Sequence, residues 1–252
     1  QLNQITFSSS EYIFTFITKP QCVYILFASA SIISKVVYHP ENRILQPSPN
    51  CSLCPRLLQY RLKNRSSFPQ CHNAPVKPFG GLDSQLLIVG LAPGLKGANQ
   101  TGRPFTGDYA GDLLYKTLIE FGFAEGEYKK QAEDNLSLKD CRITNGVRCV
   151  PPKNKPTGTE IKNCAKFLRA EIKGMKNLIC ILALGGIAHT TVLAVLNQKR
   201  AKWPFKHAAI HYLPNLPILV DSYHCSRYNT NTGRLTNVMF NEVFLNLKKL
   251  LY

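Results

Sequence analysis

Acidic side chains are scarce in this chain of 252 residues, in which 15 Asp and Glu stand against 31 Lys and Arg. The formal net charge is +16 at pH 7, and the sequence pI is about 9.5. Such a basic excess argues against an enzyme of neutral metabolites and favours a polyanionic partner such as nucleic acid. A basic protein without such a partner is the alternative that charge alone leaves open.

A second absence is an apolar run long enough to cross a bilayer. The run QCVYILFASASII at 21–33 has 13 residues, whereas a transmembrane helix needs about 20. Its flanks lack the small-residue cleavage pattern of a signal peptide. We therefore expect no membrane association. We also expect residues 1–45 to be an N-terminal extension of unassigned role, followed by one domain over 46–252.

Specific phosphate-binding motifs are also missing. The stretch GLAPGLKGANQTGRPFTGD at 90–108 holds five glycines, but it matches neither GxxxxGK[ST] nor GxGxxG in register. It offers Phe105, which could stack on a base, and Asp108, whose carboxylate could handle water or a developing cation. The alternative is that Phe105 fills the core and that Asp108 only caps a helix.

Short apolar runs alternate with amphipathic stretches from residue 47 onward, which is typical of βαβ units. The pattern predicts a three-layer α/β/α fold around a central, mostly parallel, four-stranded sheet. The expected strands are 86–90, 141–145, 178–185 and 216–224, and the expected helices are 111–123, 158–175, 186–198 and 235–252.

Polar residues follow three of these strands. The stretch 90–108 follows the first strand, 145–148 follows the second, and HCSRYNTNTGR at 224–234 follows the fourth. Ligands of such sheets lie outside the carboxyl ends of the strands, so these stretches should converge. His224 is placed to donate a hydrogen bond to a developing anion. The other histidines are expected to be structural, namely His39, His72, His189, His207 and His211.

Nine cysteines, an odd number, argue against a disulfide framework. Cys51 and Cys54 form a CxxC motif, and Cys149 and Cys164 follow on the far side of a predicted strand. Four thiolates can hold zinc or an iron–sulfur cluster, and spacing alone does not choose between them. A cysteine taken singly can equally be a small buried apolar residue. The other five are expected not to be ligands, namely Cys22, Cys71, Cys141, Cys180 and Cys225.

Taken together, GLAPGLKGANQTGRPFTGD, ITNGVRCVPPKNKP and HCSRYNTNTGRLT, with the upstream CxxC, resemble the iron–sulfur uracil-DNA glycosylases, and most closely their type-B or family-five branch. The resemblance covers residues 47–252 and implies the uracil-DNA glycosylase fold, a four-stranded parallel sheet between helices. It implies hydrolysis of the N-glycosidic bond of uracil in DNA, which leaves an abasic site. Leu91 stands where the type-A branch has Glu, so the resemblance gives the handling of water to Asp108.

The resemblance also implies roles for single residues. Phe105 would stack on the flipped base, Asn145 would read its polar edge, and His224 would hydrogen-bond the carbonyl oxygen that gathers charge. No lysine is expected in Schiff-base position, so we expect a monofunctional hydrolase. The expected base pocket comprises Gly90, Leu91, Ala92, Pro93, Gly94, Phe105, Asn145 and His224.

Cofactor and partners follow from the same resemblance. Cys51, Cys54, Cys149 and Cys164 would hold a [4Fe-4S] cluster with a structural role, since glycosidic hydrolysis transfers no electrons. We expect DNA containing uracil or other deaminated bases as partner, a monomer, and the prokaryotic cytoplasm. The competing hypotheses are a non-catalytic nucleic-acid-binding module with a four-cysteine metal or cluster site and an electron-transfer protein. The expected DNA contacts are Arg148, Lys153, Lys155, Arg227, Arg234 and Tyr228, the last as a wedge.

Overall fold

A computed structural model describes residues 3–9, 12–19, 22–29, 32–38 and 44–252. The chain divides into two compact units, Gln1–Ile44 and Leu45–Tyr252. The first unit is an antiparallel sheet in which each strand pairs with the next one along the sequence. The structure describes only the backbone of this sheet. The assignment of this unit as an extension outside the functional domain stays a prediction. Its strands are β1 (Asn3–Ser9), β2 (Tyr12–Lys19), β3 (Cys22–Ser29) and β4 (Ile32–Tyr38).

The second unit is built on a five-stranded sheet in the order β10-β11-β9-β5-β8. Its four long strands are parallel, which confirms the predicted sheet, and a two-residue antiparallel strand is added at one edge. That edge strand is too short to have left a pattern in the sequence. The strands are β5 (Leu86–Gly90), β8 (Cys141–Asn145), β9 (Cys180–Leu184), β10 (Ile210–His211) and β11 (Ile218–Ser222).

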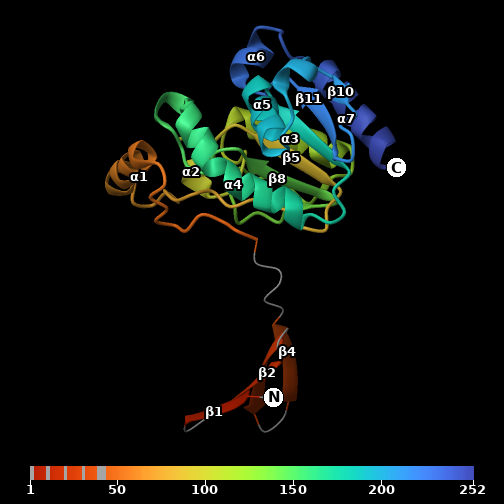
Figure 1. Ribbon diagram of the computed structural model, residues 1–252. Coiled ribbons are helices and arrows are strands. Elements are labelled where there is room, and N and C mark those ends of the chain that lie inside the picture. The colour runs from red at the N-terminus through yellow and green to blue at the C-terminus, as the bar shows by residue number, and fades with distance from the viewer. Residues whose placement is uncertain (1–2, 10–11, 20–21, 30–31, 39–43) are drawn as a thin grey trace. The chain divides into compact units, whose positions relative to one another are not determined.

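Helices cover both faces of this sheet, as the three-layer prediction requires (Figure 1). The α3 (Tyr109–Glu120) and α7 (Asn237–Leu251) helices pack on one face, and α4 (Gly158–Gly174) and α5 (Gly186–Val195) pack on the other. Side chains of β5 alternate between the two faces, as the two-residue period of a strand demands.

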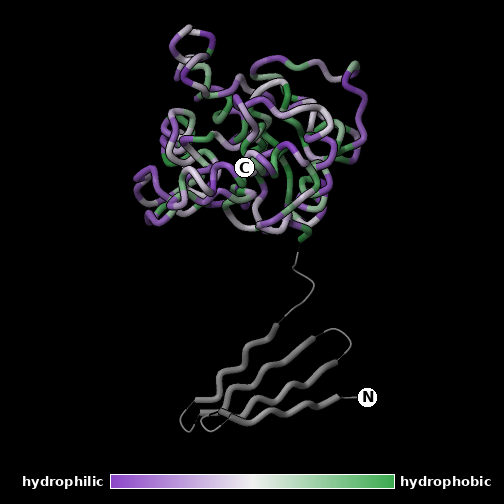
Figure 2. Tube along the Cα trace, turned by 90° about the vertical axis from the view of Figure 1, so that its left-hand side faces the viewer, coloured by the Kyte–Doolittle hydropathy of each residue, from purple (hydrophilic) through white to green (hydrophobic). Residues whose placement is uncertain are grey.

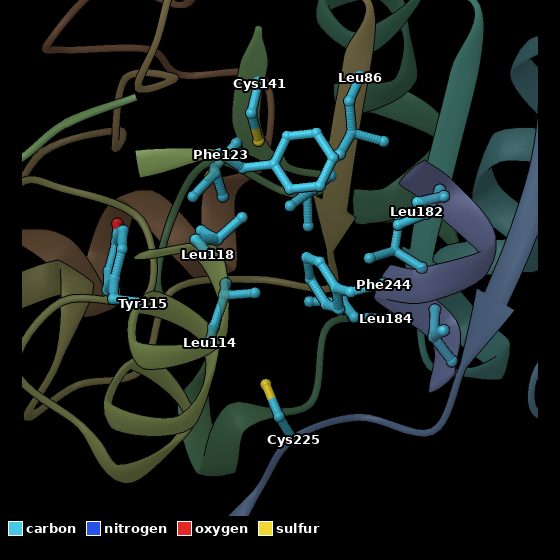
Figure 3. Close-up of a cluster of buried hydrophobic side chains, with 14 of the residues drawn as sticks. Leu86, Leu114, Tyr115, Leu118, Phe123, Cys141, Leu182, Leu184, Cys225 and Phe244 are labelled. Carbon is cyan, nitrogen blue, oxygen red and sulfur yellow. The ribbon is translucent and has the colours of Figure 1, made fainter. Parts of the chain in front are cut away.

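The larger core cluster lies on the α3 and α7 face. Figure 3 shows Leu114 and Leu118 of α3 and Phe244 of α7 gathered with Leu86 and Leu182 of the sheet. All five side chains are fully buried. Figure 2 shows that apolar segments of the second unit lie in its interior and polar segments lie around them. Burial of apolar surface therefore fixes the frame on which the polar loops are held.

Short elements connect the layers. The α1 helix (Pro55–Ser67) was not predicted, and it begins with a proline, which suits the first helical position. Thr157 and Glu160 form a capping box that starts α4. Among the described helices, none is both long and apolar enough to cross a bilayer. The remaining elements are α2 (Ala98–Thr101), β6 (Ala124–Glu125), β7 (Ser137–Leu138), η2 (Pro152–Asn154), η3 (Arg200–Lys202) and α6 (Arg227–Asn231).

Candidate active site and cysteine site

A cavity of about 620 Å³ lies at the carboxyl ends of β5 and β8. The three polar stretches converge there, because the strands are parallel and Gly90 pairs with Asn145 at their ends. Every residue expected in the base pocket or in catalysis lines this cavity except Gly90, which lies behind the wall. Residues that sequence reasoning missed also line it, namely Lys96, Ala98, Gly107, Tyr109, Ala110, Asn154 and Ser226.

Asp108 caps α3, as the structural alternative expects, and it also lines the cavity, so its role towards water stays a prediction. Its Oδ1 accepts a hydrogen bond of 3.1 Å from the backbone N–H of Gly111. Its Oδ2 lies beside the glycine turn, where a β-carbon on Gly97 would be only 2.5 Å away. The positive end of the α3 dipole favours a negative charge at this position. Gly97 thus leaves the space that the carboxylate occupies.

Gly90 leaves space for two other side chains of the site. A β-carbon there would lie 2.5 Å from both Phe105 Cζ and Asn145 Oδ1. Gly90 and Gly97 therefore serve the packing of the site's own side chains. This differs from the phosphate cradle that a Gly-rich turn after a strand first suggests.

The substitution Gly90→Ala is expected to lower the free energy of unfolding by about 1–3 kcal/mol through overpacking. It should also weaken substrate binding, because the Phe105 ring and the Asn145 amide must move. Urea unfolding and KM for the substrate would measure the two effects. Gly158→Ala is the matched control, since a β-carbon there meets nothing within 4 Å. Equal behaviour of the two variants would contradict this account of the turn.

Phe105 is held in an unusual backbone conformation. Its φ is +53°, in the left-handed region that non-glycine residues rarely adopt. Tyr115 donates a hydrogen bond of 2.6 Å to Pro104 O, and Tyr128 donates one of 3.3 Å to Phe105 O. Burial raises the pKa of both phenols, that of Tyr128 to about 12, so both hydroxyls keep the proton they donate. These bonds hold the ring in the cavity wall, 6% exposed.

A buried ion pair supports the same loop from outside. Arg103 donates two hydrogen bonds to Asp134, of 2.6 and 2.7 Å, and a third of 2.8 Å to Thr106. The guanidinium also lies over the rings of Tyr115 and Tyr128. The Phe105 turn is therefore fixed before any ligand enters.

His224 follows β11 and lies against Phe105, with ring centroids 5.9 Å apart and an interplanar angle of 27°. Burial lowers the pKa of the imidazole below its ordinary 6.5, and the negative charge of Asp108 opposes that shift. The imidazole is therefore uncharged at neutral pH. Cys225 donates an S–H hydrogen bond of 3.4 Å to Ala110 O, which ties the His224 loop to the start of α3.

Arg148 is not available to DNA, so its assignment as a phosphate contact was wrong. It is 1% exposed, and its guanidinium hydrogen-bonds Thr144 and Glu171. Glu171 is a fully buried carboxylate of α4 that also pairs with Arg142. A buried charge requires such partners, and nothing in the local sequence of Arg148 revealed one.

The other expected DNA contacts are exposed, namely Lys153, Lys155, Arg227, Tyr228 and Arg234. Tyr228 is 72% exposed, and the Arg227 guanidinium lies 5.4 Å from the ring centroid of Tyr109. Lys96 is likewise exposed and lines the cavity, so one lysine lies at the site. That no lysine acts in Schiff-base position stays a prediction.

The four cysteines of the expected ligand set lie together around a second, smaller cavity. Cys51 and Cys54 precede α1, Cys149 follows β8, and Cys164 lies on α4. All four are free thiols. Three of the sulfurs accept N–H donors, with Arg61 Nη1 3.3 Å from Cys149 Sγ, Arg148 N 3.3 Å from Cys164 Sγ, and Asn163 Nδ2 3.8 Å from Cys54 Sγ.

The spacing of these sulfurs bears on the kind of group they could hold. A tetrahedral zinc with Zn–S bonds of about 2.3 Å would bring its sulfurs about 3.8 Å apart. Among the described residues, His189, His211 and Asp221 are the group whose ligand atoms all lie within 4.8 Å of one another. No three of the four cysteine sulfurs meet this criterion among the described residues. The His–Asp–His atoms instead hydrogen-bond one another, at 2.8 and 2.9 Å.

The fold and the site define a glycosylase of the α/β type, and comparison with known proteins agrees. The model of the uracil DNA glycosylase superfamily matches residues 77–248, so the chain belongs to that superfamily. Within it, the chain belongs with the type-5 uracil-DNA glycosylases. The enzyme so named from Thermus thermophilus is 42% identical over 205 residues, covering 79% of this chain and 93% of the relative.

Two further relatives bear the same name. The type-5 uracil-DNA glycosylase of Pyrobaculum aerophilum is 38% identical over 74% of this chain and 83% of its own length. The type-5 uracil-DNA glycosylase of Mycobacterium leprae is 39% identical over 79% of this chain and 91% of its own length. The resemblance found in the sequence is thereby confirmed. The comparisons give no support to the alternative of a non-catalytic binding module.

Proposed function

We propose that this protein excises uracil from DNA by hydrolysing the N-glycosidic bond and leaving an abasic site. One observation carries the proposal: a single cavity collects an aromatic ring, an amide, a carboxylate and an uncharged imidazole, from Phe105, Asn145, Asp108 and His224. Membership of the uracil DNA glycosylase superfamily supports it.

Recognition would begin with a flipped nucleotide. Flipping costs a few kcal/mol and is easiest at a mispaired base, and stacking and edge hydrogen bonds offset that cost. The Phe105 ring supplies the stacking surface. The Asn145 amide, which has both donor and acceptor atoms, pairs with the polar edge of uracil.

Bond cleavage would use the two remaining groups. As the C–N bond lengthens, the sugar becomes cationic and the leaving base becomes anionic. The Asp108 carboxylate stabilises the sugar and orients the attacking water, while His224 donates a hydrogen bond to the base carbonyl oxygen. An uncharged imidazole suits this donor role, because it keeps one N–H without repelling the sugar cation.

The DNA strand would meet the exposed basic side chains around the cavity. Lys153 lies in η2 and Lys155 follows it. Asn154, the last residue of η2, lines the cavity, and so does Arg227. Arg234 lies 4.7 Å from the ring centroid of Tyr223 and is exposed. These cations would contact phosphates, and Tyr228 would fill the gap that flipping leaves. We also propose that the protein is a cytoplasmic monomer.

The four cysteines would hold a [4Fe-4S] cluster. The donor set fits it: four cysteines line one cavity, and three of their sulfurs receive N–H hydrogen bonds. When bound, the cluster supplies iron–thiolate bonds that join the segment before α1, the end of β8 and α4. Its role is structural.

A duplex with one deoxyuridine tests the enzymatic proposal. Incubation followed by alkali should give strand breaks at the uracil position, and a matched thymidine duplex should give none. Breaks that appear without alkali, together with borohydride trapping of the protein on DNA, would instead indicate Schiff-base chemistry by Lys96. No breaks with uracil or hypoxanthine would overturn the proposal.

The role of His224 predicts a particular pH dependence. Since burial lowers its pKa below the ordinary 6.5, the imidazole is uncharged at neutral pH, and its ionisation should not change the single-turnover rate between about pH 7.5 and 8.5. His224→Gln, an uncharged N–H donor, should retain more activity than His224→Ala, which should lose about 10²–10³-fold. A wild-type rate that falls as pH rises through this window, with a flat profile for His224→Gln, would show that imidazolium is the active form.

A further inference from the structure

Arg61 of α1 is a buried cation without an acidic partner. Its residue is 1% exposed, yet among the described residues no carboxylate lies within 4.0 Å of its guanidinium. The other buried arginines differ, since Arg103 pairs with Asp134, and Arg142 and Arg148 pair with Glu171. Arg61 is therefore the exception among the buried arginines of the described chain.

The hydrogen bonds of Arg61 point to the cysteine site. Nη1 donates to Cys149 Sγ at 3.3 Å, and Nη2 donates to the backbone oxygen of Cys51 at 2.8 Å. Nε is buried and has no partner among the described residues. The side chain thus bridges two segments that each carry an expected ligand.

A buried charge is tolerated when an opposite charge meets it. The groups lining the cavity around Arg61 are apolar side chains, Arg148 and the four cysteines. Sulfurs bound to a metal keep negative charge, whereas neutral thiols are weak acceptors that would leave the guanidinium uncompensated. The burial of Arg61 therefore makes sense when the sulfurs are metal-bound thiolates.

We propose that Arg61 is the counter-ion of the metal–thiolate group at Cys51, Cys54, Cys149 and Cys164, which it retains in the protein and whose reduction potential it raises. This rests on the cluster proposed above. Four thiolates give a cluster net negative charge, and reduction adds to it, so a cation hydrogen-bonded to a ligand sulfur favours the reduced state. Removing the cation should lower the midpoint potential and loosen the cluster.

Two variants separate the charge of Arg61 from its shape. Arg61→Gln removes the charge but keeps an N–H donor, and Arg61→Lys keeps the charge but not the two-pronged geometry. Arg65→Met is the matched control. Arg65 lies one turn later on α1 and donates to Pro49 O, Asn50 Oδ1 and Asn73 O, but to no sulfur among the described residues.

The readouts are iron and acid-labile sulfide content, the rate of bleaching by an iron chelator, and the midpoint potential of the cluster. Arg61→Gln should bleach roughly 10- to 100-fold faster than wild type and have a lower potential. Arg61→Lys should bleach at an intermediate rate with a potential near wild type, and Arg65→Met should match wild type in both.

Wild-type bleaching and potential in Arg61→Gln would overturn the counter-ion role while leaving the cluster standing. A wild-type protein without bound metal would overturn the cluster and this proposal with it, whatever its activity on uracil. Should Arg61→Gln not fold, Arg61→Lys decides, because bleaching as slow as wild type would then contradict the bridging contact.

Discussion

Asp108→Asn is expected to slow single-turnover release of uracil by about 10²–10⁴-fold while leaving affinity for the DNA nearly unchanged. The two side chains have almost the same shape. The amide oxygen of the substituted side chain can still accept the N–H of Gly111 that Asp108 accepts now, so α3 should begin at the same residue. The substitution removes the negative charge that we propose beside the sugar, and with it the group proposed to orient water.

Asp112→Asn is the matched control for this experiment. Asp112 lies in the first turn of the same helix but bonds Lys130, at 2.8 Å on the protein surface. Single-turnover rates on a deoxyuridine duplex and dissociation constants for uncleaved DNA would be measured for both variants. Equal losses of rate and affinity in the Asp108 variant would mean that Asp108 acts through architecture alone.

Cys149→Ala is expected to remove the proposed cluster and most of the soluble, folded protein. Loss of a structural metal group can remove as much free energy as a whole domain has, about 5–15 kcal/mol. The change would also leave Arg61 without its sulfur partner. Soluble yield, visible absorbance and iron content per chain measure the effect.

Cys71→Ala controls for the loss of a thiol as such. Cys71 is a partly exposed free cysteine like Cys149, but it lies outside the expected ligand set. Its variant should keep wild-type yield and colour. A Cys149→Ala protein that stays soluble, colourless and fully active would contradict a structural role for the cluster.

The glycines of 90–108 show how far a motif can be interpreted without a structure. The five glycines indicated that the backbone lies close to a bound ligand. The neighbouring Phe105 and Asp108 indicated that this ligand is a base. The structure places Phe105 and Asn145 in the space beside Gly90, and Asp108 in the space beside Gly97. Sequence reasoning placed Gly90 in the base pocket itself, because which side chains turn back onto a loop depends on packing that the loop does not encode.

The errors share one physical origin. Arg148 follows a strand with other basic residues and looked like a surface cation, but Glu171 from a helix 23 residues away holds it in the core. Arg61 has no local signal at all, since its partner sulfur is 88 residues away. The helix that carries Arg61 was not predicted either. Its mean hydropathy is low, and its apolar residues show little helical periodicity.

The sequence by itself determined the α/β class, the four parallel strands, the convergence of three polar stretches and the superfamily. These features can be predicted without a structure, because they depend on strand periodicity, on the parallel connections between strands and on the order of the motifs. Only the tertiary structure decided which basic residues are buried, why Gly90 and Gly97 must be small, that His224 is uncharged, and that Arg61 faces the cysteines. Each of these depends on groups distant in sequence that meet in the folded protein. Steric packing decides the two glycines, and burial and partners in a medium of low dielectric constant decide the charged groups.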